Sequence, residues 1–501
     1  MPPYPAQAMR HLGSPVGAGG LAHPDATGQA GAEDCGDVAI IDIAVADGHV
    51  TDAAFRARGC GATTAAASAA CERLIGASLD DAMRVSATSL DADLGGLGPE
   101  RRHGIDVAAD AVTRALEAWY GARMGKSTHD PVPDTGRCLA PGRERVAVAM
   151  SGGVDSAVAA MLLVDQGYDV VGVTMRLWHD PVAARAERSC CAPETVRLAR
   201  ETCAALGIPH LVIDAAERFR AEVVEDFIAG YRDGRTPNPC ITCNGEVRFR
   251  ILAEAAEALG AYGMATGHYA RVDHSSGTAV LATAVDGTKD QSYMLARLTG
   301  DVLERLMLPL GDMTKDDVRA LAASRGLPAA DAVESQDVCF VGVGGYTPFL
   351  ERQGVESEAG EIVDTNGNVV GSHDGHWRYT VGQRKGLGIA APEPLYVIST
   401  DAAANRVVVG TRADLAARVI AVEDVVAHDI PDRTLDVRIR HHGQPFRGRL
   451  VLTGDGSGEV VLEDAAEAVA PGQTAALYDG DRLVAAGRIA GAPAPGNRTE
   501  D

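Results

Sequence analysis

Apolar and polar positions change their spacing several times along the chain, and each change predicts a different kind of element. Residues 62–76 and 105–120 are rich in alanine and repeat their apolar residues at a helical spacing. Residues 38–45 form a short apolar run that predicts a strand. Residues 1–27 carry Pro, Gly and Ala without any period, so we expect a loose arm there.

Further along, strands alternate with helices. Apolar runs predict strands at 145–150, 169–175 and 210–213 and a strand ending at Thr266, and helical spacing predicts helices at 157–166, 194–206 and 246–259. Such alternation is typical of a parallel, doubly wound sheet. The expected fold class is therefore α/β for the centre of the chain.

Beyond residue 300 the pattern changes twice. Residues 315–325 predict a helix, and from about residue 360 short strands such as 406–409, 436–439 and 458–462 are joined by Gly and Asp turns. The short strands predict a small β-barrel. The expected division is an arm (1–27), an α+β domain (28–121), a linker (122–143), the α/β domain (144–300), a small helical central domain (301–358), the barrel (359–490) and a tail (491–501).

Composition agrees with several globular domains. The chain has 501 residues, of which 46% are hydrophobic and 23% charged, enough for roughly three to four domains. No run approaches the ~20 apolar residues of a membrane span, and the first residues lack a secretion signal, so we expect a cytoplasmic protein without membrane contact. Ten cysteines in such a protein are expected to be reduced thiols, with Cys190, Cys191 and Cys203 structural.

The net charge of −23 argues against broad nucleic-acid binding but leaves room for a local basic surface. Two groups of basic residues are candidates. The first is Arg378, Arg384 and Lys385, and the second is Arg433, Arg438, Arg440, Arg447 and Arg449. Without other support, solvent-exposed strand edges explain these two groups of basic residues equally well.

The loop Ser151-Gly152-Gly153-Val154-Asp155-Ser156 lies between a predicted strand and a predicted helix. Its glycines let the backbone approach an anion, and the helix N-terminus favours phosphate. No lysine follows, so this is not the usual P-loop pattern. The loop resembles the pyrophosphate-binding loop of the ATP pyrophosphatases, which split ATP between the α and β phosphates, and in that family Asp155 helps to position Mg²⁺.

Further motifs narrow the resemblance. They are Thr236-Pro237-Asn238-Pro239, Cys243-Asn244, Thr266-Gly267-His268-Tyr269, Lys289-Asp290-Gln291-Ser292-Tyr293, Asp337-Val338-Cys339-Phe340 and the run from Tyr379 to Gly388. Over residues 144–490 the chain resembles the bacterial tRNA-specific 2-thiouridylases. The resemblance implies an ATP-dependent sulfurtransferase that adenylates and thiolates C2 of the wobble uridine of tRNA, releasing AMP and pyrophosphate.

The resemblance also assigns roles to residues. ATP would be held by Ala149, Met150, Ser151, Gly152, Gly153, Val154, Asp155, Ser156, Met175 and Gly267. The target base and the rest of the tRNA would face Asn238, Pro239, Cys240, Lys289, Asp290, Gln291, Arg440 and His441. Cys243 matches the nucleophile and Cys339 the persulfide carrier, whose reactive forms are thiolates, so the site is expected to lower thiol pKa values.

Cys240 adds a second route for sulfur. The commoner pattern of the family has aspartate at this position, so Cys240, Cys243 and Cys339 could together hold a [4Fe–4S] cluster whose fourth iron carries sulfide. A spare thiol beside a disulfide-forming pair is the alternative, and the sequence favours neither.

The first 120 residues lie outside this resemblance. Cys35-Gly36-Asp37, Gly59-Cys60 and the run from Leu97 to His103 resemble the IscU/NifU-type iron–sulfur scaffolds. A third scaffold cysteine should follow His103, but Gly104 stands there. Cys35, Asp37, Cys60 and His103 could still bind zinc or iron, or the domain could serve only for docking a partner.

The partners expected from both resemblances are tRNA and a cysteine desulfurase or sulfur-relay protein. Two other functions stay open on the sequence alone. One is another enzyme with the same loop, an amidotransferase or ligase that delivers nitrogen. The other is an iron–sulfur carrier with a regulatory nucleotide domain.

Overall fold

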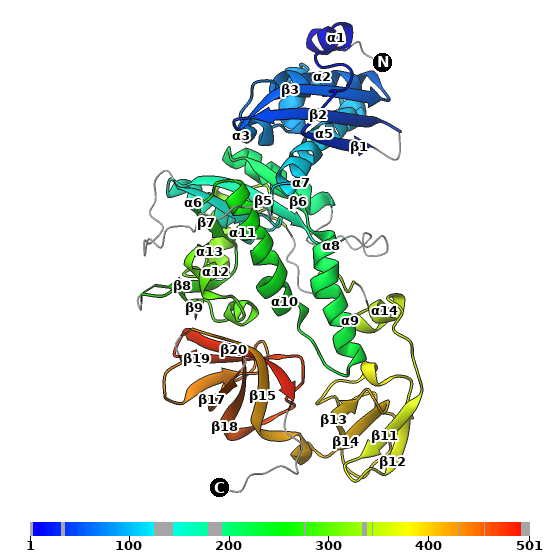
Figure 1. The fold of residues 1–501 in the computed structure, drawn as a ribbon, viewed down its shortest axis with the longest axis vertical. Helices are drawn as coiled ribbons and strands as arrows, with labels where there is room; N and C mark the ends of the chain where they lie inside the picture. The colour runs from blue at the N-terminus through cyan, green and yellow to red at the C-terminus, as the bar shows by residue number, and fades with distance from the viewer. Residues whose placement is uncertain are drawn as a thin grey trace.

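A computed structural model describes residues 4–31, 36–124, 144–178, 193–274, 277–332, 338–342, 344–428, 430–454 and 456–491. The N-terminal domain lies at one end of the molecule, the α/β domain in the middle and two β-rich units at the other end (Figure 1). Within these ranges, none of the helices combines the length and the apolar character that crossing a membrane requires.

The N-terminal domain packs helices against a three-stranded antiparallel sheet of order β1-β2-β3. Its elements are α1 (Ala6–Gly13), β1 (Ala26–Gly31), β2 (Val38–Ala46), β3 (His49–Arg58), α2 (Gly61–Leu74), α3 (Leu79–Met83), α4 (Ala87–Asp93) and α5 (Arg102–Gly121). Helices α2 and α5 confirm the two alanine-rich predictions. Small alanine side chains let these helices pack closely on each other and on the sheet.

The prediction of a loose arm over residues 1–27 is wrong for its helical part. Ala8 and His11 of α1 are fully buried, and His11 Nδ1 lies 2.8 Å from Ser68 Oγ of α2. The burial of one face of this short helix stabilises a segment whose composition alone suggests disorder.

The middle domain contains the predicted parallel sheet, with strand order β10-β7-β4-β5-β6. Its strands are β4 (Arg145–Ala149), β5 (Asp169–Arg176), β6 (His210–Asp214), β7 (Gly263–Ala265) and β10 (Leu306–Met307). From β4 the chain continues to β5 and β6 on one side and later returns to β7 on the other. Ligands of such sheets bind at the carboxyl ends of the strands where the order reverses, here β4 and β7.

Helices cover this sheet and extend from it. They are α6 (Val154–Asp165), α7 (Pro193–Leu206), α8 (Ala216–Phe219), α9 (Glu225–Arg232), α10 (Pro239–Thr242), α11 (Phe249–Ala258), α12 (Gly300–Glu304), α13 (Lys315–Ser324) and α14 (Tyr346–Arg352). The predicted helix 246–259 is interrupted, because Cys243–Arg248 (η4) is a π-helical stretch that precedes α11. Single π-helical turns are frequent at functional sites.

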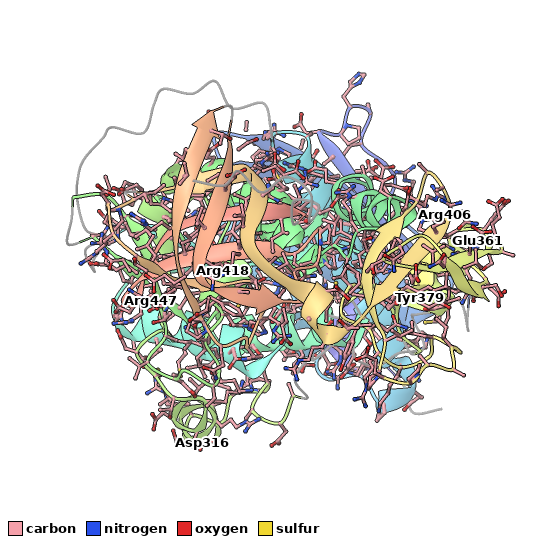
Figure 2. All side chains as sticks on the ribbon, turned by 90° about the horizontal axis from the view of Figure 1, so that it is seen from below. Asp316, Glu361, Tyr379, Arg406, Arg418 and Arg447 are labelled. Carbon is pink, nitrogen blue, oxygen red and sulfur yellow. The ribbon has the colours of Figure 1, made fainter. Side chains whose placement is uncertain are left out.

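The C-terminal β region is two units rather than the single barrel expected from residue 359. The first is a four-stranded sheet of order β12-β11-β14-β13, made of β11 (Gly360–Asp364), β12 (Val369–His373), β13 (Tyr396–Asp401) and β14 (Arg406–Gly410). Arg406 and Glu361 of this sheet form an ion pair of 3.3 Å, whereas Arg418 and Arg447 belong to the second unit (Figure 2). Both units have short strands and Gly turns, so the strand pattern alone did not separate them.

The second unit is a closed barrel. It consists of β15 (Ala416–Ala427), β16 (Leu435–Arg438), β17 (Phe446–Gly454), β18 (Ser457–Glu467), β19 (Thr474–Asp479) and β20 (Arg482–Gly491), and pairing of β15 with β20 closes the ring. The hairpin β8 (Ala270–Asp273) and β9 (Val280–Thr283) of the α/β domain continues the sheet beyond β20. This pairing fixes the barrel to the α/β domain.

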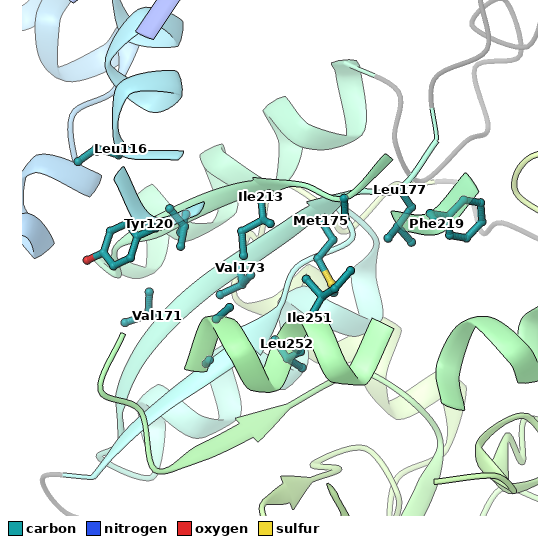
Figure 3. Packing of buried hydrophobic residues seen from close by; sticks show 14 of the residues in the cluster. Leu116, Tyr120, Val171, Val173, Met175, Leu177, Ile213, Phe219, Ile251 and Leu252 are labelled. Carbon is teal, nitrogen blue, oxygen red and sulfur yellow. The ribbon is translucent and has the colours of Figure 1, made fainter. Parts of the chain in front are cut away.

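The N-terminal domain also packs directly on the α/β domain. Leu116 and Tyr120 of α5 lie beside the buried sheet residues Val173 and Ile213 (Figure 3). Glu117 accepts hydrogen bonds from Arg176, the one to Oε2 being 2.6 Å, and burial raises the pKa of Glu117 while Arg176 opposes the rise. Further ion pairs join Arg200 to Asp110 (2.8 Å) and Arg145 to Asp80. The two domains therefore share one apolar core bordered by charge pairs.

The buried histidine of β6 makes the stability of the α/β domain depend on pH. Burial, with a smaller contribution from the charge of Arg200, lowers the pKa of His210 to about 3. Because the unfolded chain binds this proton near pH 6.5, stability is complete above that pH and falls as the pH decreases. At pH 5 we expect a loss of about 2 kcal/mol in the free energy of unfolding.

Thermal unfolding at pH 7.5 and at pH 5 tests this pH dependence. The difference in melting temperature between the two pH values should be smaller for His210→Gln than for wild type. His49→Gln, at an exposed histidine, should behave like wild type. Equal pH dependence of wild type and His210→Gln would contradict the assignment.

Candidate active site

The loop between β4 and α6 has the geometry of an anion site. Gly152 has φ of +77°, and a Cβ there would lie 2.3 Å from the Thr195 carbonyl oxygen. The Ser156 hydroxyl donates to the Gly153 carbonyl (3.0 Å) and accepts from the Ser151 backbone N–H (3.2 Å), which fixes the turn. The N-terminus of α6 begins at Val154 and adds a positive end of the helix dipole.

The other residues expected to hold ATP lie at neighbouring strand ends. Gly267 follows β7, and a Cβ there would lie 2.6 Å from the Asp155 carbonyl carbon, so only glycine permits this approach. Met175 is near the end of β5 and is 9% exposed. Ala149 is the last residue of β4, and Met150 follows it. The order of the strands therefore brings together the parts of the chain that the sequence assigned to ATP.

Asp155 lies at the centre of a polar network. Lys315 Nζ, from α13, donates to both carboxylate oxygens, at 2.7 and 2.8 Å. The Tyr269 hydroxyl donates to Oδ1 at 2.8 Å. Sequence reasoning missed Lys315 and Tyr269 as site residues, because no pattern links position 155 to position 315.

This network bears on the magnesium expected at Asp155. Mg²⁺ prefers carboxylate oxygens that can enter an octahedral shell. Both oxygens of Asp155 accept hydrogen bonds from an ammonium group, so the residue does not offer a metal site in this arrangement.

Cys243 and Cys339, the two cysteines expected to handle sulfur, both contact the extended apolar core that runs through the N-terminal and α/β domains. Cys243 begins the π-helical stretch and is 5% exposed, and Cys339 is partly buried against that core. All six cysteines in the described part of the chain are free thiols: Cys60, Cys71, Cys203, Cys240, Cys243 and Cys339. Cys203 is buried in the core beneath Gly172, as expected of a structural residue.

Phe340 positions the loop that carries Cys339. This side chain is 1% exposed, and its ring lies among Phe227 (5.2 Å), Phe349 (5.2 Å) and Phe219 (5.7 Å). Aromatic pairs in edge-to-face geometry stabilise such a contact beyond their buried area. The backbone at Cys339 is thereby fixed to α9 and α14.

Cys240 differs from its neighbour. It lies three residues before Cys243, a spacing that places two side chains on one helix face, but it is exposed where Cys243 is buried. Desolvation raises the pKa of the Cys240 thiol, and the charge of Arg248 opposes the rise.

The segments expected to contact tRNA converge at the barrel. The Thr236 backbone N–H donates to the Pro471 carbonyl (2.7 Å), and Gln473 Nε2 donates to the Thr236 carbonyl (2.8 Å). Asn238 caps α10, accepting a hydrogen bond from the Ile241 N–H, and Pro239 is its first residue. The barrel therefore holds the segment that carries Asn238 and Pro239.

Asp290 has a structural position within its motif. It is 7% exposed and accepts hydrogen bonds from Arg438 (3.0 Å) and from the Ser292 hydroxyl (3.0 Å). The Gln291 backbone N–H donates to the Tyr269 carbonyl (2.7 Å), and the Tyr269 N–H donates to Gln291 Oε1 (2.9 Å). Asp290 therefore orders the loop, and its neighbour Lys289 is partly buried.

The predicted basic groups are partly neutralised. Four of their members pair with carboxylates: Arg378 with Glu351, Arg433 with Asp479, Arg438 with Asp290 and Arg447 with Asp436. Within the described ranges, Arg384, Lys385, Arg440 and Arg449 form no ion pair. His441 Nε2 lies 3.4 Å from the Asp290 carbonyl oxygen, and burial lowers the pKa of this imidazole. Arg440 and His441 thus lie next to the loop that carries Lys289.

The N-terminal domain has its own cluster of ligand-type residues. Ligand atoms of Asp37, Cys60 and His103 all lie within 4.8 Å of one another. Desolvation would raise the pKa of Asp37, but hydrogen bonds from Thr63 and Cys60 and the charge of His103 lower it on balance. An ionised carboxylate, a thiol and an imidazole fit zinc or iron. Cys35, the fourth expected ligand, lies outside the described residues.

Gly104 stands where a scaffold would have its third cysteine. A Cβ at this position would lie 2.7 Å from the Thr63 backbone nitrogen and 2.8 Å from Thr63 Oγ1. Helix α5 packs on the first turn of α2 at this point, so a larger residue would need a backbone shift. The close packing of α5 on α2 therefore leaves no room for a cysteine side chain at position 104.

Comparisons with known proteins agree with this domain order. Family models match as the NifU-like N terminal domain (residues 3–126), the tRNA methyl transferase HUP domain (144–343), the tRNA methyl transferase PRC-barrel domain (347–411) and the aminomethyltransferase beta-barrel domain (420–489). The last two confirm that the C-terminal β region is two units.

Curated relatives cover the whole chain or its larger part. The chain is 42% identical to the "bifunctional protein NifU/MnmA" of Rubrobacter xylanophilus, over 97% of this chain and 98% of that protein. It is 48% and 47% identical to the "tRNA-specific 2-thiouridylase MnmA" of Xanthobacter autotrophicus and of Azorhizobium caulinodans, each over 68% of this chain and 90% of the relative.

Proposed function

Because the chain belongs to the family of bifunctional NifU/MnmA proteins, we propose that it is an ATP-dependent sulfurtransferase that converts a tRNA uridine to 2-thiouridine. The observation that carries the proposal is an anion-binding loop at the switch point of the sheet, followed along the chain by the segments that carry the free thiols Cys243 and Cys339. The substrate class comes from the curated relatives, which are 2-thiouridylases. A nitrogen-delivering enzyme would have no use for the two cysteines.

The reaction we propose has two stages. The O2 oxygen of the wobble uridine attacks the α-phosphorus of ATP held at Ser151–Ser156, pyrophosphate leaves, and C2 then carries AMP as a leaving group. Preorganised backbone N–H groups of the loop stabilise the charge that develops on the phosphates. Magnesium would accompany ATP as its counter-ion rather than as a ligand of Asp155.

In the second stage a persulfide on Cys339 attacks C2 with its terminal sulfur, and AMP leaves. The Cys243 thiolate then attacks Cys339 Sγ, so that a Cys243–Cys339 disulfide forms and the electron pair of the broken S–S bond stays on the sulfur at C2. A dithiol reductant must restore both thiols. The free state of both cysteines in the structure is the starting state of this cycle.

The N-terminal domain is the part of the chain through which we expect sulfur to be supplied. We propose that Asp37, Cys60 and His103, with Cys35, hold one zinc or iron ion and that the domain binds the cysteine desulfurase or relay protein that loads Cys339. A fused docking domain raises the effective concentration of such a partner, to roughly the millimolar range for a short linker. The finer assignments of residues to tRNA, at Asn238, Lys289, Gln291, Arg440 and His441, belong to the same proposal.

Product analysis tests the function. With substrate tRNA, ATP, a cysteine desulfurase with cysteine as the persulfide source and a dithiol reductant, the protein should form AMP and pyrophosphate in equal amounts, and digested tRNA should contain 2-thiouridine. ADP and phosphate as products, or an amidated base in place of the thiolated one, would contradict the proposal.

Iron content decides between the two sulfur routes. We expect the persulfide route, because Cys240 is exposed and has a raised thiol pKa, which disfavours the thiolate that a cluster needs. Anaerobically purified protein should be active without iron at the cysteine site, and Cys240→Ala should keep activity within a few-fold. A brown protein with about four iron atoms, colourless and inactive as Cys240→Ala, would establish the [4Fe–4S] route instead.

A further inference from the structure

Strand β5 is paired on both sides along its first part but on one side at its end. Residues 169–173 pair with β4, whose last partner is Ala149, and the chain then leaves β4 for the phosphate loop. In the described part of the sheet, the last residues of β5, Thr174, Met175 and Arg176, pair only with β6. The backbone at Met175, which the family resemblance assigns to ATP, therefore depends on β6 for its position.

Strand β6 is an edge of this sheet, and helix α5 of the N-terminal domain covers it. Edge strands present unpaired N–H and C=O groups, which another element often covers. Leu116 and Tyr120 of α5 are buried together with Ile213 of β6 (Figure 3). The two strand ends beside the expected nucleotide are thus supported from outside by a different domain.

An ion pair joins the two domains at the end of β5. Arg176 Nη2 donates to Glu117 Oε2 at 2.6 Å and also to the second carboxylate oxygen. The Glu117 side chain is 13% exposed and that of Arg176 is 31% exposed. Among the described residues, the other carboxylate near this guanidinium is Asp214 of β6, at 3.7 Å and mostly exposed. Glu117 is therefore the main partner of a largely buried cation, and removing one member of such a pair is costly.

A second ion pair crosses the same interface at the opposite end of the sheet. Arg145, the first residue of β4, pairs with Asp80 of α3 and, at 2.8 Å, with Asp169. The side chains of Arg145 and Asp80 are 24% and 26% exposed, so this pair is buried to a similar extent. Because it lies where β4 begins, the whole length of the strand separates it from the phosphate loop. The two pairs differ mainly in their distance from the expected nucleotide.

We propose that the N-terminal domain stabilises the nucleotide site of the α/β domain, and that Glu117 positions Met175 for ATP through Arg176. Glu117 acts through another residue, so it is a positioning residue and not a catalytic one. The fused domain then contributes to the use of ATP in addition to any role in the supply of sulfur. The choice of nucleotide rests on the proposed function.

The effect of Glu117 depends on how Arg176 is held. The Arg176 carbonyl accepts a hydrogen bond from the Ala215 N–H at 2.9 Å, next to the last pair of the ladder between β5 and β6. The side chain extends past Asp214, its register partner, to Glu117. With the carboxylate neutralised, the guanidinium turns toward solvent and the end of β5 gains conformational freedom. ATP must then order this segment on binding, and that cost lowers the affinity.

Equilibrium binding of ATP to the full chain, without tRNA, tests the proposal. Glu117→Gln removes the charge but keeps the shape of the side chain. It should lower the affinity for ATP roughly threefold to thirtyfold, the range for substitutions that act on a site through packed neighbours. Glu117→Asp should recover part of this affinity. Asp80→Asn, the matched control, should bind ATP within twofold of wild type.

Thermal unfolding of the same variants separates positioning from stability. Glu117→Gln and Asp80→Asn should both melt below wild type, because each leaves a largely buried arginine with fewer partners, whereas ATP affinity should fall in Glu117→Gln alone. Unchanged ATP affinity in Glu117→Gln would overturn the proposal, and so would an equal loss in Asp80→Asn. If Glu117→Gln does not fold, Arg176→Lys takes its place, and an affinity equal to that of wild type would overturn the proposal.

The assay does not depend on thiolation. Wild type that binds no ATP would contradict the proposed function. Wild type that binds ATP with an affinity insensitive to Glu117→Gln would overturn only the role of the N-terminal domain.

Discussion

Replacing Cys339 with serine is expected to reduce 2-thiouridine formation on the order of a thousandfold or more, the usual scale for loss of a covalent catalytic group. Serine has nearly the same shape, so the loop held by Phe340 should keep its place. Because adenylation precedes sulfur transfer, this variant should still release pyrophosphate in a burst of about one equivalent per site. The measurement is single-turnover thiolation followed beside pyrophosphate release.

Cys243→Ser should lose thiolation to a similar extent, but it should accumulate tRNA joined to Cys339 through sulfur, because the step that frees the product is missing. Cys71→Ala is the matched control, since it removes a fully buried thiol from helix α2 of the N-terminal domain. Thiolation by Cys339→Ser at more than a tenth of the wild-type rate would contradict the persulfide role.

The second large effect is expected at Asp155. Asp155→Asn removes the charge that holds Lys315 and turns one acceptor into a donor, so the ammonium loses its anchor. We expect ATP cleavage to fall roughly hundredfold or more, the scale for removing one preorganised electrostatic group, with little change in far-UV circular dichroism. Initial rates of pyrophosphate release with saturating tRNA measure it.

Asp165→Asn provides the control for this change. Asp165 lies on the same helix and also forms an ion pair with α13, but it is about half exposed and distant from the loop in sequence. Its variant should cleave ATP within twofold of wild type. Equal losses in the two variants would indicate that the contact between α6 and α13, rather than the charge at position 155, supports activity.

Local sequence was sufficient to predict the elements on which this site is built. The strand 145–150, the loop and the following helix were predicted because apolar runs and Gly-Gly act over few residues. The expected nucleotide residues were brought together because parallel strands end at the same edge of the sheet. Predictions of this kind depend on short stretches of chain and succeed where local preferences agree with the fold.

Other features depend on contacts between distant segments. Lys315 meets Asp155 across 160 positions, and its own surroundings in the sequence predict only the start of a helix. Helix α1 was missed because its burial depends on a partner surface on α2. The C-terminal β region was not divided, since pairing of β15 with β20, which closes the barrel, leaves no mark in either strand alone.

Helix α5 separates the metal-type cluster of the N-terminal domain from the contact with the α/β domain. His103, one of the three cluster residues, is at its first turn, and Glu117, which binds the α/β domain, is fourteen residues further along. At 1.5 Å per residue these points lie about 21 Å apart along the helix axis. A cysteine side chain at the cluster cannot reach across that length of helix to the contact. A sulfur carrier docked at the cluster would therefore need an arm of its own to reach beyond the contact.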